Sequence, residues 1–190
     1  VLDDVDWKII GQLQLDGRKT FKELGEAIGF TGLGAKKRVK KLLGQGYIKL
    51  TALVNVEKLE MYLAMILLEM ESADDLRRTI NQYKDCPRVI NFFTAIGGYN
   101  LIALIMAENQ HILECESMEK CSLRSREGIR RSEFYPIGKV HYPYLHLRHF
   151  LQRGDREVTP CGVDCRDCIG FQAKRCVGCP SVSYYKGPLR

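Results

Sequence analysis

Apolar positions recur at helical spacing through the first 45 residues and then change to strand-like runs. The spacing predicts helices over residues 3–15, 20–28 and 31–43. Thr20 and Glu23 fit a capping box at the start of the second helix. Residues 47–50 and 52–54 are typical of two short strands. The order predicts that residues 1–55 form a winged helix-turn-helix.

The middle of the chain follows a different order of elements. Strands are predicted over 62–70, 89–96, 101–107 and 129–135, with helices over 74–83 and 110–118. This βαββαβ order is that of a ferredoxin-like domain, here over residues 60–140, so the chain belongs to the α+β class. The helices cover one face of the sheet. The other face needs a cover, and we expect a second copy of the chain, which makes a homodimer.

Composition narrows the class of protein. The chain has 190 residues, of which 45% are hydrophobic and 27% charged, as is ordinary for a globular protein. Its longest apolar runs, 62–68 and 101–107, are too short to cross a bilayer, and no leader opens the sequence. We therefore expect a cytoplasmic protein with no membrane partner. The net charge is +6, with the excess cations at the two ends.

The third predicted helix carries most of the basic charge of its region. Its cations would contact DNA phosphates from beside a buried apolar stripe, and Arg38 is the best base-reading candidate. A solvated helix face would explain the same charge run. The predicted DNA-binding residues are Thr31, Lys36, Lys37, Arg38, Lys40 and Lys41.

Five of the eight cysteines fall near the end of the chain, in a module predicted over residues 161–190 after a connector at 141–160. They are Cys161, Cys165, Cys168, Cys176 and Cys179. Four thiolates suit either zinc or a [4Fe–4S] cluster. Disulfides, or no metal, remain a third alternative. We prefer the cluster. His146 and His149 have ligand-like spacing but are expected to be surface or packing residues. The segment resembles small domains of the CGxxCxxC type.

Several segments in order resemble the Lrp/AsnC (leucine-responsive, feast/famine) transcription regulators. They are residues 2–10, 16–18, 21–24, 38–42, 45–49 and 51–55. The resemblance implies a dimeric regulator on double-stranded DNA, with dimers that can assemble into larger rings. Gly32 and Gly34 depart from the usual start of the recognition helix. The turn Gly97, Gly98, Tyr99 and Asn100 matches a weak effector pocket, but it lacks the acidic residues that would hold an α-amine.

Three functions are compared. The preferred one is a DNA-binding regulator whose cysteine-rich tail senses redox state or metal. The first alternative is a constitutive regulator with a structural zinc tail. The second is an enzyme resembling the siroheme decarboxylases, which share the two-domain architecture but use His and Arg in the pocket. Residues 89–107 contain neither. No catalytic motif is found, so we predict that the protein is not an enzyme.

Overall fold

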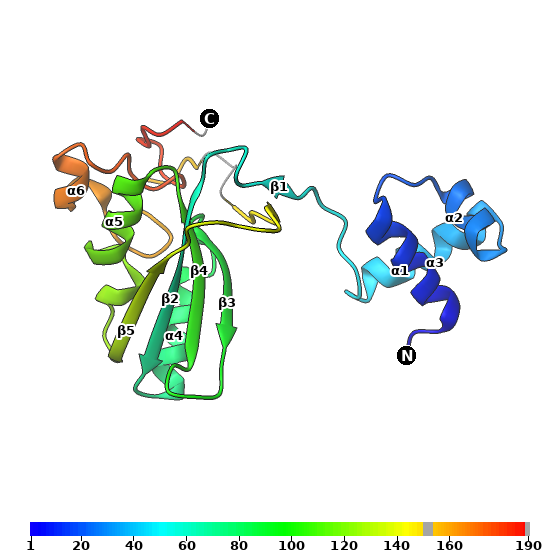
Figure 1. Cartoon of the computed structure of the whole chain (residues 1–190), viewed down its shortest axis with the longest axis horizontal. Coiled ribbons are helices and arrows are strands. Elements are labelled where there is room, and N and C mark those ends of the chain that lie inside the picture. Colours follow the sequence, from blue (N-terminus) through cyan, green and yellow to red (C-terminus); the bar gives the residue numbers. More distant parts are fainter. Residues whose placement is uncertain (150–153, 189–190) are drawn as a thin grey trace. The chain divides into compact units, whose positions relative to one another are not determined.

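The computed structural model describes residues 1–149 and 154–188. Positions 150–153 of the predicted connector and 189–190 of the predicted cysteine-rich module lie outside the described residues. The chain divides into two compact units, residues 1–52 and 53–190, and each is described by itself (Figure 1). No helix in the described part of the chain is long and apolar enough to cross a membrane.

The first unit consists of three helices, α1 (Asp4–Leu15), α2 (Phe21–Ile28) and α3 (Gly32–Gly44). Each begins at a capping side chain, and the Thr20–Glu23 capping box is confirmed. One apolar face of each helix points inward, as the spacing predicts. The small core that results is made of Ile9, Leu24, Ala35, Val39 and Leu42.

The predicted hairpin after α3 is wrong. Residues 47–53 contain no strand, and β1 (Val54–Asn55) pairs antiparallel with β6 (Tyr144–Leu145) instead. Only Thr51 separates the two predicted strands, whereas the shortest common hairpin loops have two residues. The partner strand β6 lies in the predicted connector and was missed because it is only two residues long.

The second unit contains the predicted ferredoxin-like domain. Four strands, β2 (Tyr62–Met70), β3 (Val89–Thr94), β4 (Leu101–Ala107) and β5 (Ile129–Pro136), form an antiparallel sheet in the order β3-β4-β2-β5. Helix α4 (Ala73–Tyr83) follows β2, and α5 (Gln110–Met118) follows β4; η1 (Leu123–Ser125) is a short 3₁₀ turn before β5. The βαββαβ order is therefore confirmed.

The two faces of the sheet differ in burial. Ala64, Ile66 and Leu68 of β2 pack into the main core with apolar residues of α4 and α5. On the opposite face, Met65 and Tyr135, which pair across β2 and β5, remain exposed. Side chains of β2 alternate between faces, so Met65 lies on the face that the helices do not cover. Leu63 lies on the same face but is buried in a cluster with Val56 and Leu147, so the open face is the part around Met65 and Tyr135.

The cysteine-rich segment packs in the second unit beside the sheet domain. It contains the 3₁₀ turn η2 (Cys165–Asp167) and the four-residue helix α6 (Ile169–Gln172). Cys161 and Cys176 belong to the main core of that unit, together with residues of α4, α5 and the sheet. The tail therefore shares a core with the domain that precedes it.

Candidate functional site

The lysines of α3 form the basic surface of the first unit. Lys36, Lys37, Lys40 and Lys41 are all exposed, while the apolar stripe between them is buried. Thr31 caps the helix, and its Oγ1 accepts a 3.1 Å hydrogen bond from the Gly34 amide. Four exposed cations on one helix can contact a phosphate backbone without reading the base sequence.

Arg38 is placed differently from the lysines. Its Nη1 donates to Asp3 Oδ2 at 2.6 Å and to Asp6 Oδ1 at 2.9 Å. Asp6 is buried, and the hydrogen bond from Arg38 holds the pKa of the Asp3 carboxyl below its ordinary value. In this structure Arg38 joins α3 to the start of α1. A contact with a base would require it to leave both carboxylates.

The backbones at Gly25 in α2 and Gly32 in α3 lie so close to neighbouring backbone that a side chain at either position would be crowded. A Cβ on Gly25 would lie 2.7 Å from the Phe30 carbonyl oxygen and 2.9 Å from the Gly32 amide nitrogen. A Cβ on Gly32 would meet the backbone of Lys22 at 3.3 Å. The departure at Gly32 is thus explained by the close approach of the two helix backbones, which sets the position of α3.

The turn at residues 97–100 closes one end of the sheet. The Asn100 amide donates to the Met70 carbonyl at 3.0 Å and accepts from the Met70 amide at 2.8 Å. The Tyr99 hydroxyl donates to the carboxylate of Glu133 on β5. Gly97 and Gly98 are exposed. An acidic group therefore does lie beside Tyr99, but it belongs to β5, which is distant from the turn in sequence.

All eight cysteines of the chain line a single cavity. The cavity itself is small, with a volume of about 20 Å³. Five of these cysteines were predicted, and Cys86, Cys115 and Cys121 were not. All eight are free thiols. His146 and His149 are not among the lining residues. The remaining lining residues are Arg88, Glu116, Thr159, Val163, Phe171 and Gly178.

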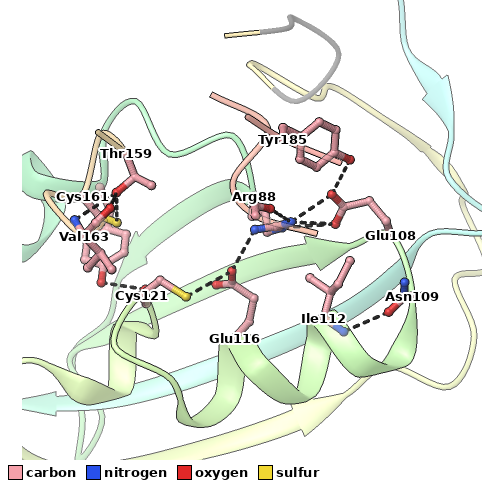
Figure 2. Close-up of polar contacts among 12 residues, drawn as sticks. Arg88, Glu108, Asn109, Ile112, Glu116, Cys121, Thr159, Cys161, Val163 and Tyr185 are labelled. Atoms are coloured by element: carbon pink, nitrogen blue, oxygen red, sulfur yellow. Dashed lines mark hydrogen bonds and ion pairs between the residues drawn. The ribbon is translucent and has the colours of Figure 1, made fainter. Parts of the chain in front are cut away.

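Arg88 is buried and lines this cavity. Figure 2 shows its polar contacts. Arg88 Nη2 donates to Glu108 Oε1 at 2.9 Å and to the Gly178 carbonyl at 2.7 Å, and Nη1 donates to Glu116 Oε1 at 3.3 Å. The Tyr185 hydroxyl donates to the same Glu108 oxygen at 2.6 Å. Burial raises the pKa of Glu116 and so disfavours its ionised form, which would place a second negative charge beside Glu108.

The thiols are held in a low-polarity setting. Burial raises the pKa of Cys115 and of Cys165 to about 12, and the charge of Arg88 acts against this rise at Cys165. Thr159 Oγ1 lies 3.1 Å from Cys161 Sγ. Such thiols are neutral unless a cation is present to favour the thiolate.

The side chains that line the cavity are not arranged as a metal site in this structure. Within the two described ranges, no three His, Cys, Asp or Glu side chains form a set that could hold a metal ion. Metal binding by the five tail cysteines thus stays a prediction. A bound metal would have to draw thiols inward from the cavity wall.

Comparisons with known proteins agree on the first three quarters of the chain's architecture. The AsnC-type helix-turn-helix domain matches residues 2–43. An uncharacterised HTH-type transcriptional regulator of Pyrococcus furiosus is 31% identical over 130 residues, which cover 68% of this chain and 83% of that relative. The regulator FL11 of the same organism is 29% identical over 142 residues, covering 74% and 92%.

Solved structures share the fold. Escherichia coli AsnC aligns with a TM-score of 0.63 and 18% identity, covering 74% of this chain and 95% of AsnC. A Neisseria meningitidis transcriptional regulator in complex with L-Met aligns with a TM-score of 0.65 and 23% identity, covering 78% and 99%. Both are therefore matched almost whole, whereas about a quarter of this chain has no counterpart in either.

Proposed function

Because the chain belongs to the Lrp/AsnC family of helix-turn-helix transcription regulators, we propose that it is a dimeric, sequence-specific DNA-binding regulator whose cysteine-rich tail carries a metal-responsive or redox-responsive centre. The chain is a DNA-binding regulator of this type and not an enzyme, as its named relatives are HTH-type transcriptional regulators. The siroheme decarboxylase alternative finds no support among them.

The observation that carries DNA binding is the row of exposed lysines on α3 of an AsnC-type helix-turn-helix. In a dimer, two such helices would enter successive major grooves of a roughly palindromic site. Lysine contacts to phosphates release counterions, so binding should weaken steeply with added salt. Selection from a random-sequence duplex pool, followed by titration of the selected duplex at several salt concentrations, tests this directly.

The dimer is supported by the open face of the sheet. Met65, Phe93 and Tyr135 are exposed there, on three different strands. Exposed apolar groups gathered on one sheet face favour burial against another protein surface. A second copy would present the same face, as a two-fold symmetric interface requires. We infer that this face forms the dimer interface. A regulator that binds DNA in this way is expected in the cytoplasm.

Five buried thiols and one buried cation support the proposal of a metal centre in the tail. Four thiolates can hold either zinc or a [4Fe–4S] cluster, and of the two we propose the cluster. Arg88 would balance part of the negative charge that several thiolates bring. A bound cluster would supply a redox-active or labile group, while the surrounding residues hold it and limit access of solvent.

One experiment separates this proposal from a constitutive regulator with structural zinc. Iron, acid-labile sulfide and zinc are measured per chain on protein purified without oxygen. About four irons and four sulfides support the cluster. About one zinc and no iron favour the structural alternative. DNA affinity is then compared before and after oxidation, and unchanged affinity excludes a sensing role.

A further inference from the structure

The eight cysteines come from two separate walls of one cavity. Five belong to the tail, and the other three belong to the ferredoxin-like domain. Cys115 lies on α5, Cys121 follows the same helix, and Cys86 follows α4. These three thiols are scattered in the sequence, yet each faces the same space as the tail cysteines.

The two walls are in direct contact at α5. A Cβ on Gly170 of α6 would lie 2.9 Å from Cys115 Sγ, so the backbone of the tail helix packs closely against this sulfur. Cys115 is buried in the main core with Cys161 and Cys176 of the tail. The Gln82 side chain of α4 also donates a 2.8 Å hydrogen bond to the Cys161 carbonyl.

Polar groups of the domain wall also reach the tail thiols. Cys168 Sγ lies 3.5 Å from Glu119 Oε2, one turn after Cys115. Cys121 Sγ donates to Glu116 Oε1 at 3.8 Å, and Glu116 accepts from Arg88. Glu119 thus contacts a tail thiol and Glu116 contacts a thiol of the domain wall, and groups that hydrogen-bond to metal ligands help to orient them.

We propose that the metal–thiolate centre is shared between the two walls, with Cys115 and its neighbours Cys86 and Cys121 supplying ligands beside those of the tail. This inference rests on the proposed metal binding of the tail. It adds that the centre fastens the tail to α5 and the ferredoxin-like domain. Loss of the centre would then release a contact inside the domain expected to carry the dimer interface.

The test compares metal content in full-length variants purified without oxygen. In C86S/C115S/C121S the domain wall is altered and the tail is intact. In C161S/C165S/C168S the tail is altered instead. We expect both variants to retain much less iron or zinc per chain than the wild-type chain, because removal of ligands should cost at least the roughly 10–100-fold in metal affinity that removal of their supporting groups costs. I112V, a conservative change of a buried α5 residue outside the cavity, should keep the wild-type content.

The outcomes separate the two proposals. A wild-type chain that holds no metal overturns both. A wild-type chain that holds metal, with C86S/C115S/C121S holding the same amount with the same visible spectrum, overturns the shared site and leaves the tail site standing.

Hydrogen exchange on the wild-type chain provides a test that does not depend on folding of the variants. A shared centre should slow exchange in residues 110–118 when iron or zinc is bound, compared with the metal-free chain. Slowing confined to residues 161–188 would overturn the proposal.

Discussion

Arg88 and Gly178 lie 90 residues apart in the chain, and the guanidinium of the first donates a 2.7 Å hydrogen bond to the carbonyl of the second. Arg88 also pairs with Glu108 and Glu116, and its side chain is only 4% exposed. One buried cation therefore joins Glu108, which directly follows β4, to α5 and the cysteine-rich tail. This contact makes the tail part of the ferredoxin-like unit.

Replacement of Arg88 by Met should strongly destabilise the second unit. The change leaves Glu108 and Glu116 buried without their cation, which typically costs about 3–5 kcal/mol of the free energy of unfolding. Urea denaturation of the full chain measures it. Arg77→Met removes an exposed ion pair with Asp74 on α4 and should cost less than about 1 kcal/mol. Equal losses in the two variants would contradict the assigned role of Arg88.

Gly25→Ala should displace α3 and with it the basic surface. The new Cβ would strike the backbone at Phe30 and Gly32, and such overpacking costs about 1–3 kcal/mol or more. Gly11→Ala on α1 is the matched control, because nothing lies within 4 Å of its Cβ. That change should raise helix stability by about 0.5–1 kcal/mol. Hydrogen exchange of residues 21–44 distinguishes the two, and normal protection in Gly25→Ala would refute the close approach.

The contact between Arg38 and Asp3 predicts an acid-sensitive first unit. Because the folded-state pKa of Asp3 lies below its ordinary value of 3.8, its stabilising contribution is present above that value. It is lost as the pH falls through the folded-state pKa. Arg38→Met should reduce this acid dependence, as followed by circular dichroism from pH 6 downwards to about pH 2. An unchanged acid profile would mean that the pair does not operate in solution.

Lysine substitutions on α3 should reduce the salt dependence of DNA binding. Each lost phosphate contact lowers the slope of log affinity against log salt by about 0.9. Lys37→Ala and Lys41→Ala are exposed changes that leave the buried stripe intact. Lys58→Ala, in the second unit, is the control and should keep the slope. The DNA-facing assignment fails if all three variants bind alike.

An acidic residue on the open sheet face should prevent dimer formation. Phe93→Asp places a charge where the two copies are proposed to meet, and desolvating it there is costly. Sedimentation should show a monomer. Leu15→Asp, an exposed apolar position on α1, should leave the dimer unchanged. A dimeric Phe93→Asp chain would place the interface elsewhere.

Local pattern predicted the regular elements well. Strands β2 and β4 and helix α5 were predicted to the residue, because their apolar periods and flanking turns are unambiguous. The predicted hairpin after α3 is wrong because residues 47–50 and 52–54 have strand propensity but leave only Thr51 for the loop between them. The tail cysteines were found by their spacing. Cys86, Cys115 and Cys121 carry no such spacing, and only tertiary packing brings them to the same cavity.

The most direct test of the account is DNA binding by the full chain with its centre intact and with it destroyed. Protein purified without oxygen is titrated onto the duplex selected from the random pool, before and after oxidant treatment and removal of the released metal. The account predicts steeply salt-dependent binding whose affinity changes when the centre is lost. Binding that is identical in the two states would contradict it.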